Sequence, residues 1–546
     1  MTQDISSTAI NETNDLSEVE SLRVLVQQQQ ATIAALEEQN QRLSARIRQL
    51  EAELEGQKKL KGKPKLKASR LNQSDSSAKG FGKRAGSAKR SKKNDFAVDT
   101  TRKLEPADLP EGAKLNQYRE YDVQELKIER CNIRFLLGEY SLPDGRIIRA
   151  ELPPEYRNTG HYGPVLVSYI LHEHYQNRVP QSLLYEQLQD WGIEISVGQI
   201  NRILTEKIEC FHGEQASVLQ TGLETAESIH TDDTGARQGG KNGYCTVIGN
   251  AWFSYFQSTT SKSRVNFLAI LQGRESRYVL NEYARDYLEL WALPQKHWQV
   301  LSFSSTVLAD ERSEWDAYLQ SIGIVTPKTV RVVTEAALLG GLIEGGISDT
   351  LKIISDGAGQ FNILIHALCW VHAERAIRKL EGSTARFREN IEEVQTLLWD
   401  YYQELKAYQA APTAKEKERL FHRFDEIFGR CYLHHATLTN ALKQFRKKKT
   451  ELLRVLDFPD IPLHNNDAES DIREFVIRQK ISGGTRSELG RKARDTMVGL
   501  KKTCRKLGIC FWDYLLSRLR GDQSIAPLPE LIEHKAMEHL QVSQPA

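Results

Sequence analysis

The chain has 546 residues, with 74 Lys and Arg against 72 Asp and Glu, a net charge of +2 and 7 Cys. Its length predicts several domains, and it contains no run of about 18 apolar residues that would span a membrane. The polar N-terminus lacks the apolar core of a signal peptide. The cysteines form no CxxC pair, which argues against a disulfide framework and a zinc ribbon. We therefore expect a cytoplasmic protein without membrane contact.

The small net charge conceals a strongly basic segment at residues 58–93. This segment holds 14 Lys or Arg and one acid, so the rest of the chain carries about −11. Its richness in Gly, Ser and Lys predicts disorder, and we assign 58–100 as a basic disordered linker and 1–15 as disordered as well. The segment is either a solvated linker or an arm that binds DNA phosphates, and these two interpretations are compatible.

A heptad pattern precedes the basic segment, at residues 22–54 within a region that we bound at 16–57. Leucines recur at the d positions and β-branched residues at several a positions, a pattern that favours two parallel strands of coiled coil. We predict a zipper that forms a homodimer or a higher oligomer. The alternative is a single solvated helix.

The next two regions are predicted to be a small β subdomain at 101–160 and a helical region at 161–220. A Pro-Asp-Gly turn between short β-rich runs indicates a hairpin within 123–150. Three helices follow, the third capped by Ser196, in the order of a helix-turn-helix. In that arrangement Gln199, Asn201 and Arg202 lie nearest the DNA bases; plain helix packing is the alternative.

Two aspartates are predicted to end strands of one sheet. Residues 227–232 read as a strand that ends at Asp232, followed by two more β runs and a helix at 261–272. Strands at 351–355 and 365–369 follow, the first of which ends at Asp356. This order is that of an α/β RNase H-like sheet, with Asp232 and Asp356 at the ends of adjacent central strands. We place this catalytic domain at 221–520, with insertions at about 272–350 and, entirely helical, 371–460.

A third acid, Glu469, falls in the first turn of a helix predicted over 463–480. Two aspartates and a glutamate can hold two Mg²⁺ (or Mn²⁺) ions for phosphoryl transfer. Asp233 is an equally acceptable ligand on sequence grounds. Cys369 and His372 are spaced to ligate a metal or brace the second aspartate, although packing in the core is the favoured interpretation.

The chain resembles the insertion sequence 66 family transposases of bacteria at four points in the right order. Asp232-Asp233-Thr234-Gly235 is similar to their DETG-like motif, and Asp356-Gly357 to the pair at their second acid. The string from Cys369 to Arg375 is similar to their CWxHxxR motif. Asn465-Asn466-Asp467-Ala468-Glu469 with Arg473 is similar to their NNxxER motif. The resemblance covers roughly 160–270 and 350–520.

This resemblance implies a DDE-type transposase with Asp232, Asp356 and Glu469 as catalytic residues and metal ligands. Such enzymes cut the ends of a mobile element and join them to target DNA without a covalent protein–DNA intermediate. The implied partners are double-stranded DNA at the element ends and target, with small accessory proteins of the same element as candidates. The implied location is the bacterial nucleoid.

The chain departs from the family at several positions. The upstream Cys-based zinc module is reduced to Cys131, so we predict no zinc. Position 470 is Ser where the family has Arg, which leaves Arg473 as a supporting residue. The other supporting residues are Asp233, His372 and Asn466.

Basic residues after Glu469 are predicted to position DNA without reading its sequence. These are Arg478, Lys480, Arg491, Lys492 and Lys501. The RKKK run at 446–449 either contacts phosphate or is simply solvated, and 521–546 is assigned as a C-terminal tail. Two other functions compete with transposition: a DNA-binding regulator with a decayed nuclease domain, and a structural coiled-coil protein whose basic arm binds RNA.

Overall fold

The computed structural model describes Val26, Gln29–Ala31, Ile33 and residues 98–543 except 107, 109–112, 124, 158–159, 274, 381–383 and 433–434. The described residues between 26 and 33 are helical. The predicted disordered segment at 1–15, the rest of the predicted zipper and the basic segment at 58–93 lie outside the described residues. No helix in the described part of the chain is long and apolar enough to cross a membrane.

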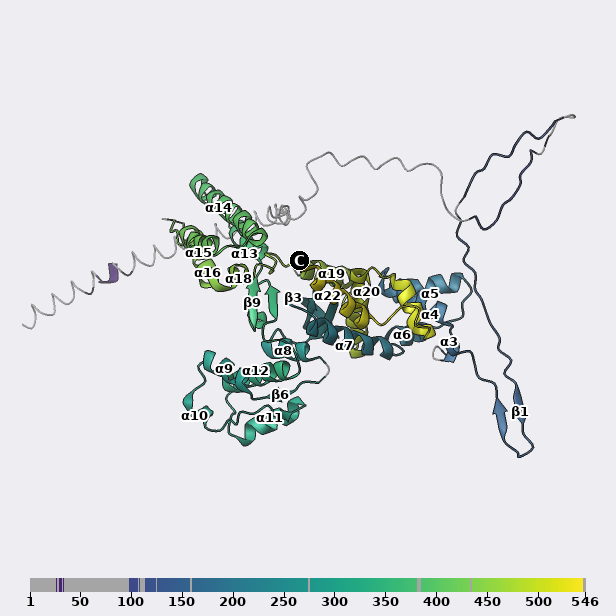
Figure 1. Ribbon diagram of the computed structural model, residues 1–546, viewed down its shortest axis with the longest axis horizontal. Coiled ribbons are helices and arrows are strands. Elements are labelled where there is room, and N and C mark those ends of the chain that lie inside the picture. The colour runs from purple at the N-terminus through teal and green to yellow at the C-terminus, as the bar shows by residue number, and fades with distance from the viewer. Residues whose placement is uncertain are drawn as a thin grey trace, which may run out of the picture. The chain divides into compact units, whose positions relative to one another are not determined.

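A five-stranded mixed sheet forms the centre of the fold (Figure 1). Its strands are β3 (Ser228–Gln238), β4 (Lys241–Gly249), β5 (Ser254–Thr259), β8 (Lys352–Ser355) and β9 (Ile365–Leu368), in the order β5-β4-β3-β8-β9. The pairs β3–β4 and β4–β5 are antiparallel, whereas β3–β8 and β8–β9 are parallel. The predicted sequence of three antiparallel strands, a helix (α8, Arg264–Gln272) and two further strands is confirmed.

The first strand is longer than its sequence predicted. It does not end at Asp232 but continues to Gln238, in register with β4, so that Asp232 lies opposite Val247. The physical reason is the turn that follows: Gly239 and Gly240 adopt φ of 53° and 78°, a conformation open to glycine, which closes a hairpin and pairs the extra residues. Asp232 is therefore held within a paired strand rather than in a loose turn.

Two long helices cover one face of β3, β4 and β5. They are α19 (Asn466–Ser482) and α20 (Glu488–Leu507), and each contacts the sheet. Phe475 of α19 stacks on Phe256 of β5 with ring centroids 6.2 Å apart. On α20 the predicted apolar stripe is buried at Met497, Leu500 and Cys504. These contacts tie the helix that carries Glu469 to the strand that carries Asp232.

The C-terminal segment, predicted only as a tail, contains a packed helix. After α21 (Phe511–Arg520) comes α22 (Leu528–Ser543), which lies against α7 (Glu209–Glu224). Leu528 and Ile532 are fully buried, and the Leu528 amide donates to Glu214 Oε1 at 2.9 Å. This helix is part of the main hydrophobic core.

The N-terminal part of the described chain contains a hairpin and then helices. The predicted Pro-Asp-Gly turn joins β1 (Glu139–Ser141) to β2 (Ile147–Arg149). Helices α3 (Pro154–Arg157), α4 (Pro164–Tyr175), α5 (Gln181–Asp190), α6 (Val197–Thr205) and α7 follow. The predicted cap is confirmed, since Ser196 Oγ accepts a hydrogen bond from the Gln199 amide at 3.2 Å.

The segment between α8 and β8 folds as helices around a small sheet. Strands β6 (Tyr278–Val279) and β7 (Val307–Ala309) pair with each other, and the helices are α9 (Glu282–Leu290), α10 (Gln295–Trp298), α11 (Arg312–Ser321) and α12 (Pro327–Glu344). Helix α12 packs on α8 and α9 (Figure 1). These residues extend the main core and leave the five-stranded sheet intact.

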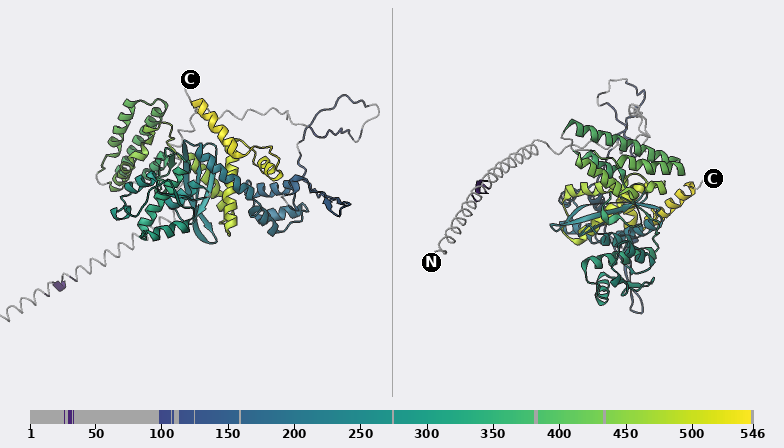
Figure 2. Two further views of the ribbon diagram at one scale, coloured as in Figure 1. Left: turned by 60° about the horizontal axis from the view of Figure 1, so that its bottom comes forward. Right: turned by 90° about the vertical axis from the view of Figure 1, so that its left-hand side faces the viewer.

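The described residues between β9 and α19 form helices joined by short loops. After β8 a short helical turn, η1 (Gly359–Phe361), precedes β9, and then come α13 (Trp370–Arg378), α14 (Ala385–Ala410), α15 (Ala414–Phe428), α16 (Ala436–Lys447), α17 (Lys449–Leu452) and α18 (Arg454–Asp457). They share a hydrophobic core of their own around Trp370, whose indole donates to Leu452 O at 3.0 Å. Figure 2 shows the long helices of this group, in green, side by side.

Candidate active site

Parallel pairing of β3 and β8 brings Asp232 and Asp356 to the same edge of the sheet. The pairing runs to His230 and Ile354. Asp232 and Asp356 each follow two residues after that last pair. Asp356 is exposed, and its Oδ1 accepts a hydrogen bond from the Ala358 amide at 3.0 Å. Gly357 then turns the chain with φ of 92°, which accounts for the Asp-Gly pair. The sequence-predicted juxtaposition of these acids is thus a property of the sheet register.

Glu469 reaches this edge because Asn465 fixes the start of α19. The Asn465 side chain is fully buried; its Nδ2 donates to Thr231 O at 2.8 Å and its Oδ1 accepts from His230 Nδ1 at 2.9 Å. Its amide also donates to Cys369 Sγ at 3.2 Å. Sequence reasoning named the neighbour Asn466, which is only half-buried. The overlooked signal was a polar residue directly before the helix, where a buried amide can link three segments.

Asp356, Asp233 and Glu469 lie close enough to Asp232 for their charges to affect its ionisation. Burial raises the pKa of Asp232, and although the Asp233 amide opposes this by donating to Asp232 Oδ1 at 2.7 Å, the charges of Asp356, Asp233 and Glu469 raise it further, to about 7. No described cationic side chain pairs with Asp232. Uncompensated like charges of this kind favour either a proton or a bound cation.

Asp233 is engaged elsewhere. Its carboxylate forms an ion pair with Lys262 and accepts a hydrogen bond from Gln360 Nε2. Burial raises its pKa, while Lys262 opposes the increase. Neither Lys262 nor Gln360 was singled out by the sequence, because nothing in their local pattern marks them. Asp232 is therefore the carboxylate of this pair that remains free for a ligand.

Glu469 contacts two side chains of α13. Arg375 Nη2 donates to its two carboxylate oxygens at 3.2 and 2.9 Å, and His372 Nδ1 lies 3.4 Å from Oε1. Arg375 Nη1 also donates to His372 Nε2 at 2.8 Å. Arg473, the predicted supporting arginine, is exposed, so Arg375 is the residue that pairs with Glu469.

Cys369 lies beneath this contact and is 1% exposed. Burial raises the pKa of its thiol to about 11. Its Sγ, a ring nitrogen of His372 and a carboxylate oxygen of Glu469 all lie within 4.8 Å of one another. The favoured interpretation of Cys369 as a core residue agrees with its burial, but its neighbours are potential metal ligands.

Two of the residues predicted to contact DNA are buried, and the prediction is wrong for them. Arg478 lies over the Tyr175 ring at 4.8 Å and donates to His174 O at 2.7 Å. Lys501 is 2% exposed and pairs with Glu474 at 2.6 Å. Burial of a charge is tolerated here because each cation has internal acceptors, and a cation so placed cannot reach a phosphate.

The remaining predicted DNA contacts lie nearer the surface. Lys480 and Lys492 are exposed, and Arg491 is partly buried by its contacts with Ser258 O and Glu488. On α6, Asn201 and Arg202 are exposed and Gln199 is half-buried.

Within the RKKK run, Lys448 lies beside the turn at Gly357, since its Nζ is 3.0 Å from where a Cβ would stand on that glycine. The neighbouring Lys449 is occupied by Asp425, at 2.7 Å, and by the ring of Phe421. Lys448 is thus the lysine of this run placed beside the second aspartate.

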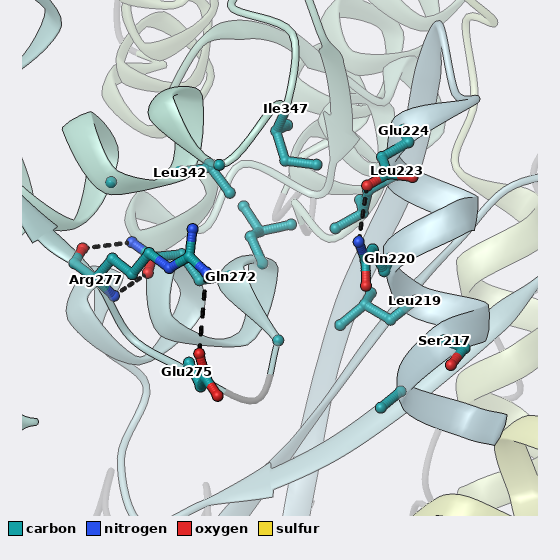
Figure 3. A pocket seen from close by; sticks show the side chains of 15 residues that line it. Ser217, Leu219, Gln220, Leu223, Glu224, Gln272, Glu275, Arg277, Leu342 and Ile347 are labelled. Carbon is teal, nitrogen blue, oxygen red and sulfur yellow. Dashed lines mark hydrogen bonds and ion pairs between the residues drawn. The ribbon is translucent and has the colours of Figure 1, made fainter. Parts of the chain in front are cut away.

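A cavity of about 340 Å³ lies elsewhere, between α7, the end of α8 and α12. Figure 3 shows Gln220 and Glu224 on one side of it and Gln272, Glu275 and Arg277 on the other. None of the three acids lines it. The carboxylate site therefore lies at the edge of the sheet and outside this cavity.

A mixed sheet surrounded by many helices, with acids from two adjacent strands and a helix, fits a DDE transposase-like fold. A family model described as "Transposase IS66 family" matches residues 339–493, a span that includes Asp356 and Glu469 but not Asp232. The chain is also 43% identical over 323 residues to "Uncharacterized protein y4jO" of Sinorhizobium fredii (strain NBRC 101917 / NGR234), covering 58% of this chain and 100% of that protein. The chain belongs to the IS66 family of transposases.

Proposed function

We propose that this chain is the transposase of a bacterial insertion sequence, which binds the element ends and catalyses metal-dependent DNA cleavage and strand transfer. The observation that carries the proposal is the convergence of Asp232, Asp356 and Glu469, expressed in the pKa of Asp232 near 7. The strand order β5-β4-β3-β8-β9, with two antiparallel and two parallel pairings, supports an RNase H-like catalytic domain.

The donor set fits Mg²⁺ or Mn²⁺, which prefer carboxylate oxygens. Asp232, Asp356 and Glu469 would hold two ions, which when bound supply an activated hydroxide and stabilise the leaving oxygen. The chain's own contribution is to gather the acids: β3 and β8 fix the aspartates, and Asn465 fixes the helix of Glu469. For all three to serve as ligands, Asp232 gives up its proton and Glu469 exchanges its contact with Arg375.

Surfaces around the site provide for DNA binding. We propose that Asn201, Arg202 and Gln199 of α6 contact bases in a major groove, as the second helix of a helix-turn-helix does. We propose that Lys480, Lys492, Arg491 and Lys448 contact phosphates near the acids, with the basic segment 58–93 adding salt-sensitive affinity. Dimerisation through 22–54 would place two such sites on one pair of element ends.

Substitution Asp356→Asn tests the proposal. The neutral amide weakens metal binding, and loss of several kcal/mol of transition-state stabilisation corresponds to a rate decrease of about 10³-fold or more. The assay is Mg²⁺-dependent joining of element-end DNA to a plasmid, with end binding followed in parallel. Asp513→Asn, at an exposed position on α21, is the matched control and should retain joining. Retained strand transfer in Asp356→Asn would contradict the assignment. End binding without any joining by the wild type would leave the DNA-binding regulator as the function.

A further inference from the structure

Cys369, His372 and Glu469 form a group of donors whose chemistry differs from that of the carboxylate site. The three donor atoms lie within 4.8 Å of one another. A thiolate and an imidazole are soft or borderline ligands that suit Zn²⁺ and not Mg²⁺. Three protein ligands with one open position are also the number that a non-structural zinc site uses. Glu469 is the residue that this group shares with the three acids.

The surroundings of these donors resemble those of an occupied cation site. The guanidinium of Arg375 touches Glu469 at 2.9 Å and His372 Nε2 at 2.8 Å, so a positive charge already stands against two of the three ligands. His372 Nδ1 is buried without a hydrogen-bond partner, although Glu469 Oε1 is 3.4 Å away. That nitrogen is a buried donor atom turned toward the group with no partner of its own.

A backbone amide donates a hydrogen bond to the Cys369 thiol. The Asn465 amide donates to Cys369 Sγ at 3.2 Å, a contact that stabilises negative charge on sulfur. Cys369 and His372 are separated by one turn of α13, which begins directly after Cys369, so the two donors project on the same side of the helix.

We propose that Cys369, His372 and Glu469 bind Zn²⁺ and that this binding inhibits the enzyme by withdrawing Glu469 from the catalytic metals. On binding, the Cys369 S–H bond breaks and its proton passes to solvent, while sulfur donates an electron pair to the metal. The His372 proton moves from Nδ1 to Nε2, so Nδ1 becomes a ligand and Arg375 leaves both partners. No oxidation or reduction takes place. The binding stands on the geometry alone, whereas the inhibition rests on the proposed function.

Cobalt absorption tests the binding without any need for activity. Co²⁺ added to the full-length protein at one equivalent should produce a thiolate-to-cobalt charge-transfer band, which one equivalent of Zn²⁺ removes. Removing a direct ligand should weaken zinc by more than the roughly 10–100-fold that an outer-shell change costs, so Cys369→Ser and His372→Gln should lose the band. Cys245→Ser is the matched control, since that cysteine is equally buried but lies in β4, where it packs against α19 and α20. A band that survives in Cys369→Ser, or no band in the wild type, would overturn the site.

Strand transfer in Mg²⁺ with increasing Zn²⁺ tests the inhibition. Each variant is compared with its own rate in the absence of zinc, so a lower basal rate does not confuse the result. The zinc concentration for half-inhibition should rise at least about 10-fold in Cys369→Ser but not in Cys245→Ser. Equal sensitivity of the two variants would overturn the inhibitory role. If the wild type joins no DNA at all, the proposed function fails, while the cobalt result still decides the zinc site.

Discussion

Helix α19 contributes an acid to each of two regions: Glu469 to the site of Asp232 and Asp356, and Glu474 to an internal ion-pair cluster. The pKa values of the buried acids shift in opposite directions in these two regions. In the first turn of α19, Glu469 joins Asp232 and Asp356, and the pKa of Asp232 rises to about 7 because burial and neighbouring acids disfavour its charge. Five residues later, burial would likewise raise the pKa of Glu474, but Lys501 and Arg178 outweigh it and lower the pKa to about 2. Glu474 is paired with fixed cations and is structural, whereas Asp232 has no described cationic partner and can accept a metal.

Removing Lys501, the cation that pairs with Glu474, should cause the largest loss of stability. Lys501→Met leaves Glu474 buried, at 8% exposure, with one fewer partner, and breaking a buried pair from one side costs about 3–5 kcal/mol. The free energy of unfolding should fall by that amount in urea titrations. Lys480→Met, on the exposed face of α19, is the control and should change stability by less than about 0.5 kcal/mol. Equal effects of the two substitutions would mean that the internal ion pair contributes little to the fold.

A smaller effect is expected from Asn465→Ala, which removes the side chain that ties the start of α19 to β3. The substitution leaves Thr231 O and the His230 ring without their partner, and an unsatisfied buried group costs about 1–3 kcal/mol. Because the start of α19 is then less fixed, strand transfer should also require more Mg²⁺ for half-maximal rate. Asn466→Ala is the matched control, at the adjacent half-buried position. A metal requirement that moves equally in the two variants would show that Asn465 does not position Glu469.

The smallest effect is a pH dependence of metal binding. With a pKa of about 7, Asp232 is mostly protonated at pH 6 and mostly ionised at pH 8, so Mg²⁺ affinity should rise about tenfold over that interval. Calorimetry in buffers of different ionisation enthalpy should show release of close to one proton at pH 6, which Asp232→Asn abolishes. Metal affinity that is flat with pH in the wild type would remove the electrostatic argument for this site.

Asp232 and Glu474 should also make the stability of the protein depend on pH in opposite directions. The pKa of Asp232 in the folded chain lies above its unfolded value, so the metal-free protein loses stability as pH rises from about 4 toward 7. The pKa of Glu474 lies below its unfolded value, so its contribution is present above about pH 4.5 and is lost as pH falls toward 2. Urea titrations at several pH values, for the wild type and for Glu474→Gln, would separate the contribution of Glu474 to the pH dependence of stability from that of Asp232.

Local pattern was enough to predict elements whose causes are local. Short β-rich and apolar runs indicated the five strands, and Ser196 marked the start of α6 because its cap depends on residues three apart. The apolar stripe of α20 followed from its period. The end of β3 was misplaced because it depends on pairing with β4, which the strand's own residues do not reveal.

Among the site residues, the three acids were proposed because Asp232 lies in a predicted strand, Asp356 follows one and Glu469 lies in the first turn of a predicted helix, within motifs that resemble a known family. Arg375, Asn465 and Lys262 were not assigned roles, because each acts on a partner distant in sequence: Glu469, Thr231 and Asp233. Arg478 and Lys501 were misassigned for the same reason. A cation is read from sequence as solvent-facing unless its internal partner is known, and Glu474 and the His174 carbonyl are brought to them only by packing.

The sequence by itself determined the order of the elements, the candidate acids and the contrast between a basic segment of +13 and an acidic remainder. Only the tertiary structure decided which charges meet. Hydrophobic period and turn chemistry act over a few residues and are written in the chain, whereas the ionisation of Asp232 or Glu474 depends on what stands beside it across β3, β8, α13 and α20. The small net charge is thus the sum of charges that folding either pairs inside the protein or leaves open to metal and DNA.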